Sequence, residues 1–308
     1  MTKSNSAQTP LIIEASLNGS TSKQQNPSVP FSDEEIVRDA IACMEAGAAL
    51  LHTHSDEPIV GGTGALAEER YARPWRELLK ARPDAILTPT MPVGQEGVPV
   101  EVRYRHVEQM ATEGLLTQGL CDPGTFNASV MGDDGLFAPS TYLYRNDVRD
   151  SRYYVETCRR LNIGLSISIF EPGFLKFILA YHRAGKMPPG GMLKFYFASE
   201  DLPFGLPPTA TSLEAYLAML GDCDMPWLVS SFGDDCVRCG IAEEAIRRGG
   251  HIQVGLEPYG GDRCPTNVEL VQEVVSLAND CGRTIATPSV AAEMLNLPTY
   301  PAPFGISN

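Results

Sequence analysis

Two histidines spaced two residues apart, His52 and His54, are the clearest candidates for chemistry in this sequence. They end the apolar run AALLHTHSD at 48–56, and an acidic, glycine-rich segment follows. Because side chains alternate faces along an extended strand, the two imidazoles would lie side by side while Thr53 points away. Imidazoles so placed can occupy two adjacent positions around a metal ion. The alternative is one buried, hydrogen-bonded histidine and one loop histidine, and the His-x-His spacing alone leaves both open.

A carboxylate that could join the histidines is Glu257, which ends the apolar segment HIQVGLEP. If the strands close into a barrel, the first and last strands are neighbours. The strand of His52 and His54 then lies only one strand away from that of Glu257. Two imidazoles and one carboxylate leave a coordination position open, as in catalytic zinc sites. Glu257 could instead cap the following helix or pair with Arg263.

The elements that must position these residues repeat one pattern, in which an apolar run is followed by a polar turn and a helix-period segment. Strands are predicted at 11–18, in the run after Gly47 that ends at His54, and at 85–90, 115–121, 163–170, 192–197, 227–231 and 251–256. Helices are predicted at 32–46, 66–81, 100–112, 147–161, 174–184, 212–220, 237–248, 267–281 and 290–295, and a long loop at 122–144. This alternation predicts an α/β fold, the (β/α)₈ TIM barrel. An open doubly wound sheet is the alternative, but no G-x-G-x-x-G follows the first strand.

Composition limits the possible partners. The chain has 308 residues and a net charge of −14, which argues against nucleic acid or an anionic membrane because both require a basic surface. No run approaches the ~20 apolar residues of a membrane span, and the polar N-terminal segment lacks the apolar centre of a signal peptide. We expect a disordered lead at 1–10, one catalytic barrel at 11–297 and a tail at 298–308. Eight dispersed cysteines fit reduced thiols and a cytoplasmic location.

The sequence resembles the β-keto acid cleavage enzymes over nearly its whole length. The segments that carry the resemblance are LIIEASLNG, EAGAALLHTHSDE, GTFN, FEPG, GGHIQVGLE, TNVELVQEV and GRTIATPSVAAEML. The resemblance implies a zinc-dependent (β/α)₈ barrel that forms a homo-oligomer, a dimer or tetramer. It also implies an acyl exchange in which a β-keto acid and acetyl-CoA give acetoacetate and a new acyl-CoA. By this resemblance the ligands of Zn²⁺ are His52, His54 and Glu257.

Further site residues follow from the same resemblance. Thr90 falls where the family has a serine near the reacting groups, and its hydroxyl could do similar work. Asn18, Gly124 and Thr125 match positions that line the pocket. Glu171, at the end of the fifth predicted strand, matches a glutamate that contacts the substrate.

The sequence also departs from the family pattern. Gln253 stands where the family has an arginine, and Pro258 stands where it has an aspartate, and both of those residues handle protons. Asp262 and Arg263 could restore the two charges or could pair with each other at the surface. Lys194, on the sixth predicted strand, stands where the family's type member has a glutamine and could bind a substrate carboxylate.

Other functions stay open from the sequence. Lys194 could form a Schiff base if burial lowered its pKa, which would make the protein a metal-free aldolase. The protein could also bind a metal or acyl-CoA without the usual activity, or hydrolyse a substrate without CoA. Many glutamates and few arginines in the predicted pocket suggest a substrate with a positive or polar tail. If CoA binds, Gly233, Gly260 and Gly261 are the candidates to meet its phosphates.

Overall fold

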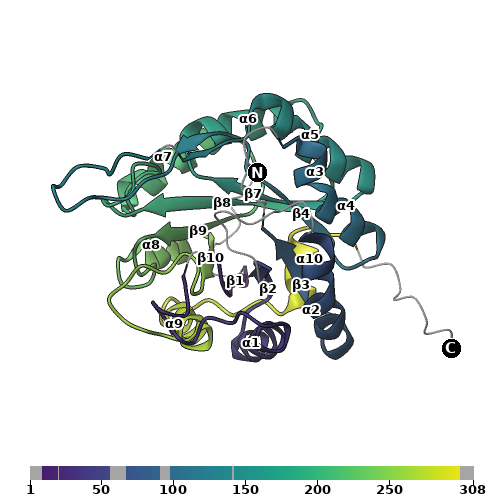
Figure 1. The fold of residues 1–308 in the computed structure, drawn as a ribbon, viewed down its shortest axis with the longest axis horizontal. Coiled ribbons are helices and arrows are strands. Elements are labelled where there is room, and N and C mark those ends of the chain that lie inside the picture. Colours follow the sequence, from purple (N-terminus) through teal and green to yellow (C-terminus); the bar gives the residue numbers. More distant parts are fainter. Residues whose placement is uncertain (1–8, 20, 56–66, 91–97, 141, 299–308) are drawn as a thin grey trace.

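Eight parallel strands form the centre of the protein. The computed structural model describes residues 9–19, 21–55, 67–90, 98–140 and 142–298. The sheet runs in the order β3-β2-β1-β10-β9-β8-β7-β4, and the ribbon in Figure 1 shows helices around it. The strands are β1 (Ile13–Ser16), β2 (Leu50–Thr53), β3 (Ile86–Pro89), β4 (Gln118–Cys121), β7 (Gly164–Ile169), β8 (Gly191–Ala198), β9 (Trp227–Phe232) and β10 (His251–Val254).

The sheet curls until its two outermost strands lie next to each other. The hydroxyl of Thr88 on β3 donates a hydrogen bond to Oε1 of Gln118 on β4, at 3.4 Å. Each strand is a short apolar run, and nearly every residue in it is buried, as a sheet covered on both faces requires. The predicted (β/α)₈ barrel is therefore confirmed, and the open doubly wound sheet is excluded.

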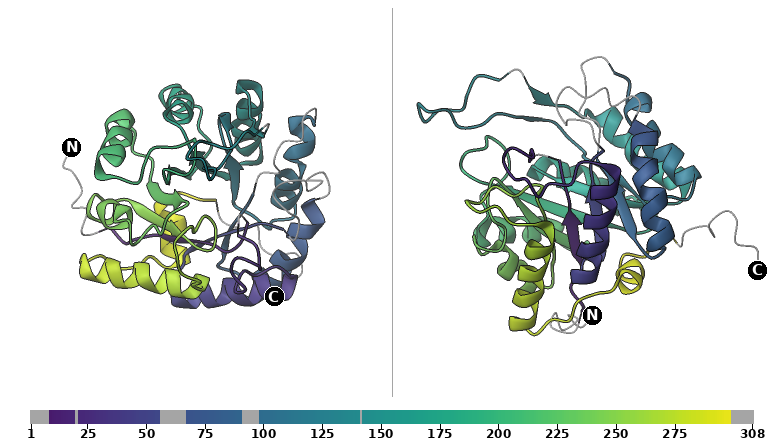
Figure 2. Two further views of the ribbon diagram at one scale, coloured as in Figure 1. Left: turned by 60° about the vertical axis from the view of Figure 1, so that its left-hand side comes forward. Right: turned by 60° about the horizontal axis from the view of Figure 1, so that its bottom comes forward.

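The helices surround the strands, as the two further views in Figure 2 show. Their bounds are α1 (Asp33–Ala46), α2 (Ala67–Ala81), α3 (Val100–Arg103), α4 (Arg105–Thr112), α5 (Val148–Leu161), α6 (Pro172–Arg183), α7 (Ala210–Leu220), α8 (Ile241–Arg247), α9 (Asn267–Asp280) and α10 (Pro288–Met294). The predicted start of α1 is confirmed, because Ser32 and Glu35 form a capping box. Gly47, with φ of 125°, ends that helix as predicted.

Two sequence predictions need correction. The helix predicted at 100–112 is divided into α3 and α4 at Tyr104, whose buried hydroxyl donates to the carbonyl of Leu120 at 2.6 Å. The segment predicted as a loop at 122–144 contains a small antiparallel pair, β5 (Phe126–Asn127) and β6 (Leu143–Tyr144). Between these strands a long arm extends away from the barrel (Figures 1 and 2). A pair of two-residue strands has too few residues to show an alternating pattern in the sequence.

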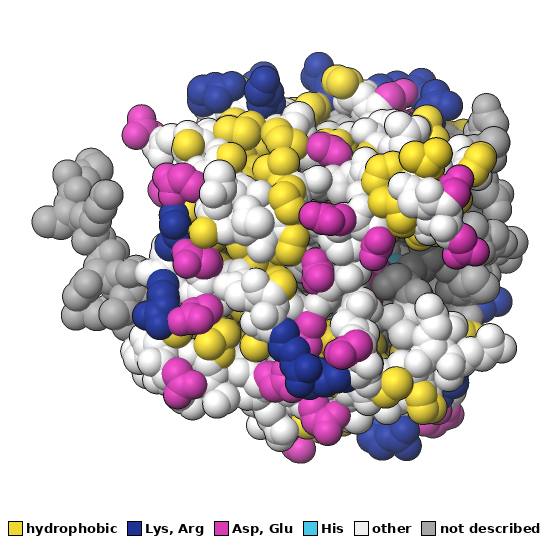
Figure 3. Space-filling model, turned by 90° about the vertical axis from the view of Figure 1, so that its left-hand side faces the viewer, with side chains coloured by type: hydrophobic (Ala, Val, Ile, Leu, Met, Phe, Trp, Pro, Cys, Tyr) yellow, Lys and Arg dark blue, Asp and Glu magenta, His cyan; other side chains and the backbone are white. Residues whose placement is uncertain are grey.

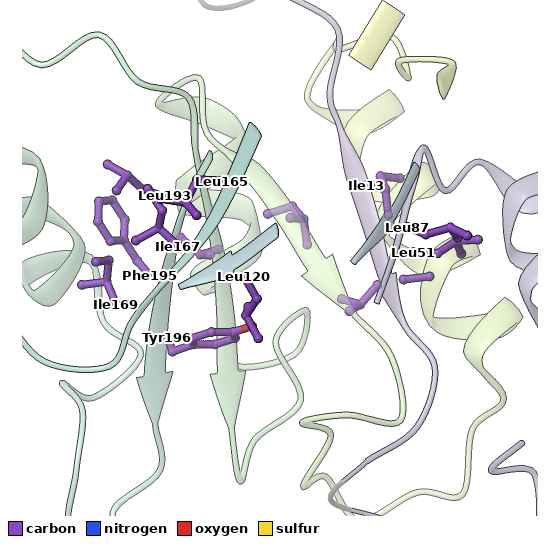
Figure 4. Packing of buried hydrophobic residues seen from close by; sticks show 14 of the residues in the cluster. Ile13, Leu51, Leu87, Leu120, Leu165, Ile167, Ile169, Leu193, Phe195 and Tyr196 are labelled. Atoms are coloured by element: carbon purple, nitrogen blue, oxygen red, sulfur yellow. The ribbon is translucent and has the colours of Figure 1, made fainter. Parts of the chain in front are cut away.

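Side chains of each strand alternate between the helices and the barrel interior. On β8, Phe195 packs among apolar residues of the outer layer, whereas Tyr196 lies beside Leu120 on the other side of the strand (Figure 4). Inside the barrel, Lys194 forms an ion pair with Glu14 of β1, and both side chains are fully buried. The sequence places Glu14 on the inner face, where a carboxylate needs a partner, and Lys194 is that partner.

No helix within the described residues is both long and apolar enough to span a membrane. Most of the predicted terminal segments, 1–10 and 298–308, lies outside the described residues, as does most of the glycine-rich segment that follows His54.

Candidate active site

His52, His54 and Glu257 meet at the end of the barrel toward which the strands run. β1 lies between β2 and β10, and Ser16 of β1 pairs with His52. The Nε2 atoms of His52 and His54 lie 3.4 Å and 2.7 Å from Oε2 of Glu257. One ligand atom from each residue lies within 4.8 Å of the other two, and all three side chains are buried. The convergence expected from the strand order is therefore present.

Backbone and side-chain contacts hold the two imidazoles. Nδ1 of His52 lies 3.1 Å from the carbonyl of Thr88, so it carries the proton and leaves the lone pair on Nε2. Asn18 accepts a hydrogen bond from the backbone N–H of His54 at 2.7 Å. Thr53 points away, as predicted, and accepts from the indole N–H of Trp75 on α2 at 3.0 Å. Asn18 thus orients the loop that carries His54 and does not line the cavity described below.

The protonation states of this cluster suit a cation. Burial raises the pKa of Glu257, but the imidazoles of His54 and His52 outweigh it and bring the pKa down to about 2. Burial lowers the pKa of His52, although Glu257 opposes this. His54 Nε2 and Glu257 Oε2 form no hydrogen bond of good geometry within the described residues, although both are buried. An anionic carboxylate and imidazole nitrogens directed to one point are the donors that divalent zinc prefers.

A cavity of about 660 Å³ opens over this cluster. Its walls include His52, His54, Thr90, Gln253, Glu257 and Pro258, six residues that the sequence analysis named. In Figure 3 a small area of histidine surface lies inside a hollow with hydrophobic side chains beside it. The volume is typical of small-molecule sites.

Aromatic rings form a large part of the opposite wall, and the sequence analysis did not identify them. They come from the end of β7, from β8 and β9, from the small β5–β6 pair and from the loop after β8: Phe126, Tyr144, Phe170, Tyr196, Phe204 and Phe232. The first and last of them, Phe126 and Phe232, are 106 residues apart along the chain, so no local pattern reveals them.

Asp122, just beyond β4, is the second buried carboxylate of the cavity. Its Oδ2 accepts a hydrogen bond from the hydroxyl of Tyr144, and its Oδ1 has no partner among the described residues. Burial raises the pKa of Asp122 above its usual value, and the hydroxyls of Tyr144 and Ser168 partly offset this rise. In the sequence, the position of Asp122 just after a predicted strand was the feature that could have identified it as a site residue.

Several predicted site residues do not line the cavity. Glu171 accepts from the backbone N–H of Gly205 at 3.1 Å, and the hydroxyl of Thr125 donates to the carbonyl of Asn146 at 3.0 Å. Gly124 packs so closely on Phe174 that a Cβ atom there would stand 2.0 Å from its ring. Their roles toward a substrate stay predictions.

Arg263 and Asp262, the two charged residues that could have replaced the family's arginine and aspartate, make their contacts elsewhere. Arg263 forms ion pairs with Asp235 and Glu273, and not with Glu257 or Asp262. Asp262 is exposed and lies 3.9 Å from Arg238. Neither of the two lines the cavity.

Lys194 lies deeper than the cavity. Its amine donates a hydrogen bond to Glu14. Gln253 lies next to this pair, and its Nε2 donates to Ser16 Oγ at 3.1 Å. A Schiff base requires an amine that reaches the substrate, so this arrangement does not favour the aldolase alternative. The glycines proposed for CoA phosphates are close to each other, since Gly260 packs on the backbone of Gly233, but phosphate binding there stays a prediction.

Comparison with known proteins identifies the family. A sequence model described as "beta-keto acid cleavage enzyme" matches residues 10–297. The chain belongs to this family. It is 28% identical over 292 residues to a 3-keto-5-aminohexanoate cleavage enzyme of Acetoanaerobium sticklandii, covering 93% of this chain and 98% of that protein. It is 26% identical over 300 residues to a 3-oxoadipate:acetyl-CoA acetyltransferase of Cupriavidus necator, covering 94% and 96%.

The fold of this chain is similar to that of a solved structure, the apo form of ObcA. The TM-score is 0.66 at 16% identity, and the match covers 88% of this chain and 66% of that one. At this identity the likeness concerns the fold alone. The family match and the named relatives make this chain an enzyme that acts on β-keto acids.

Proposed function

We propose that the protein transfers an acyl group from a β-keto acid to CoA, with acetyl-CoA as co-substrate and acetoacetate as the second product. The observation that carries this proposal is the convergence of His52, His54 and Glu257 at the floor of one cavity. The names of two relatives, a cleavage enzyme for a keto acid and an acetyl-CoA acetyltransferase, support the same reaction. Zinc as the ion, a homo-oligomer and a cytoplasmic location stay predictions.

The three side chains fit a catalytic metal site. They offer two imidazole nitrogens and a carboxylate oxygen, and they leave the side toward the cavity free for substrate. A divalent cation held there would polarise the ketone and carboxylate oxygens of a β-keto acid and make the carbon between them, C2, more acidic.

The exchange forms one carbon–carbon and one carbon–sulfur bond and breaks one of each. C2 loses a proton and bonds to the acetyl carbonyl carbon, and the CoA thiolate leaves. The thiolate then attacks the ketone carbon of the original acid, and the bond from that carbon to C2 breaks. Acyl-CoA and acetoacetate are released after C2 takes a proton. Thr90, on the cavity wall, offers a hydroxyl to an oxyanion that develops in these steps.

The proton of C2 needs an acceptor, and Gln253 and Pro258 cannot provide one. Within the described cavity wall, Asp122 and Glu257 are the carboxylates, and Glu257 is engaged with the two imidazoles. We assign to Asp122 the role of accepting this proton, because its raised pKa and unpartnered Oδ1 suit a general base. Asp122→Asn should lower kcat by about 100-fold or more while metal content is retained.

One experiment tests the whole proposal. Purified protein is incubated with β-keto acids and acetyl-CoA carrying ¹³C in its acetyl group, and products are read by mass spectrometry. The label should appear in acetoacetate, and the new acyl-CoA should be unlabelled. Turnover that does not require acetyl-CoA would favour hydrolysis instead. His52→Ala and Glu257→Gln should lose bound zinc together with activity, and full zinc content in Glu257→Gln would contradict the site.

A further inference from the structure

We propose, on the basis of the function above, that the acyl chain of the substrate is uncharged and apolar, a branched alkyl or aryl group. The inference concerns the part of the β-keto acid beyond the ketone. This part must extend from the histidine and glutamate cluster across the cavity, and the wall it meets there decides which chains bind.

That wall is a continuous group of aromatic rings. Phe126 lies at its centre, with its ring centroid 4.9 Å from Tyr144, 4.9 Å from Phe170 and 4.4 Å from Phe204. Tyr196 extends the group at 4.8 Å from Phe170. Rings in such contact present a broad apolar surface, and a chain buried against it gains roughly 25 cal/mol for each Å² removed from water.

The described wall of the cavity provides no basic side chain to pair with a second carboxylate of the substrate. No lysine or arginine belongs to its wall within the described residues. Lys194 and Arg263, the basic residues that the sequence analysis named for the site, are each paired with carboxylates. An acyl chain that ended in a carboxylate would therefore lose its hydration without gaining a partner.

A cationic chain is disfavoured by how the rings pack. A cation binds over the open face of an aromatic ring. Phe126 and Tyr144 are stacked with an interplanar angle of 14°, and Phe170 and Tyr196 with one of 21°, so one face of each of these rings is covered by its partner. Asp122, the carboxylate on this wall, already receives the hydroxyl of Tyr144, and its other oxygen is the one that we assign to the proton of C2.

Two pairs of substrates of matched shape test the inference. In the first pair, 5,5-dimethyl-3-oxohexanoate differs from 4-trimethylammonio-3-oxobutanoate by a carbon in place of the charged nitrogen. In the second, 6-methyl-3-oxoheptanoate replaces the terminal carboxylate of 3-oxoadipate with an isopropyl group. With saturating acetyl-CoA, kcat/KM should be at least tenfold higher for the neutral member of each pair. A charged member that is equal or better in either pair overturns the inference.

A binding measurement separates this inference from the proposed function. Calorimetric titration of the zinc-loaded protein with the same four acids, without acetyl-CoA, should give the same order of affinities. If the order holds and no acyl-CoA forms in the kinetic assay, the proposed function fails and the inference stands. If acyl-CoA forms and a charged acid binds best, the inference fails and the function stands.

Two matched phenylalanine variants test whether the aromatic wall causes the preference for a neutral acyl chain. Phe204 is half-buried on the cavity wall, whereas Phe177 is half-buried on α6 against Tyr181 and outside that wall. Phe204→Ala should lower kcat/KM for 5,5-dimethyl-3-oxohexanoate by at least fivefold and leave 3-oxopentanoate, with its short chain, within twofold. Phe177→Ala should change neither. Equal losses on the long and short chains in Phe204→Ala would contradict a role for the ring wall in selecting the acyl chain.

Discussion

Gly19 lies so close to Glu257 that a Cβ atom at position 19 would stand 2.5 Å from the carboxylate. Its φ of 135° is a conformation that residues with a side chain rarely adopt. Just after β1 the backbone therefore lies so close to Glu257 that position 19 can carry a hydrogen atom but not a side chain. Glycine at this position lets the carboxylate face the imidazole of His54.

Gly19→Ala should therefore displace Glu257 and weaken metal binding. We expect zinc retention during dialysis to fall at least tenfold, measured by elemental mass spectrometry. Gly185→Ala is the control, because Gly185 also has positive φ, of 62°, but a Cβ atom there would have no neighbour within 4 Å. The control should lose about 1 kcal/mol of stability and no zinc. Equal zinc content in both variants would show that the close approach does not matter.

The ion pair between Lys194 and Glu14 lies inside the barrel, and removing one partner should be costly. Lys194→Met leaves an unpaired carboxylate at a position with no exposure to solvent, so the free energy of unfolding should fall by about 3–5 kcal/mol. The double variant Glu14→Leu with Lys194→Met removes both charges and should recover much of this loss. Urea unfolding of the three proteins measures the difference.

The same variants test the remaining role of Lys194. Borohydride treatment with a keto acid should trap no covalent adduct at this lysine in the parent protein, because its amine is held by Glu14. An adduct that disappears in Lys194→Met would revive the aldolase alternative.

Local patterns predicted much of the fold and the convergence of His52, His54 and Glu257. Alternation along the predicted strand placed His52 and His54 on one face and Thr53 on the other, and the contact between Thr53 and Trp75 confirms that Thr53 points away, although β2 itself ends at Thr53. The order of strands in a barrel brought Glu257 to the same end. Both depend on geometry that repeats in every strand and in every closed barrel.

What the sequence could not reveal depends on contacts between distant segments. The pairing of Glu14 with Lys194 joins residues 180 positions apart. Phe126 and Phe204 meet because the arm after β4 and the loop after β8 lie against each other, and no periodicity encodes that meeting. The break of the predicted helix at Tyr104 has the same origin, since the buried hydrogen bond to Leu120 competes with local helix propensity.

Acid should destabilise the fold through buried histidines away from the cavity. Burial, aided by Arg283, lowers the pKa of His251 to about 3, and its Nδ1 accepts from the N–H of Ile12 at 3.0 Å. In the unfolded chain the same group takes up a proton near pH 6.5. Its contribution to stability is therefore complete above pH 6.5 and is lost as pH falls toward about 3, at up to about 1.4 kcal/mol per pH unit.

His251→Gln should accordingly reduce the dependence of stability on pH. Between pH 6 and pH 4.5, the free energy of unfolding of the variant should fall less steeply than that of the parent, by about 1 kcal/mol per pH unit. Chemical denaturation at several pH values gives both slopes. Parallel slopes would mean that His251 takes up its proton equally in the folded and unfolded chains.

The bond between Thr53 and Trp75 separates stability from metal binding. Trp75 is fully buried on α2, and its indole N–H has the Thr53 hydroxyl as its acceptor. Thr53→Val keeps the shape of the side chain but leaves that N–H unsatisfied, so stability should fall by about 1–3 kcal/mol. Thr53→Ser keeps the hydroxyl and should lose less. Because Thr53 faces away from Glu257, both variants should retain the zinc content of the parent, and loss of zinc in Thr53→Val alone would mean that α2 positions the histidines through this bond.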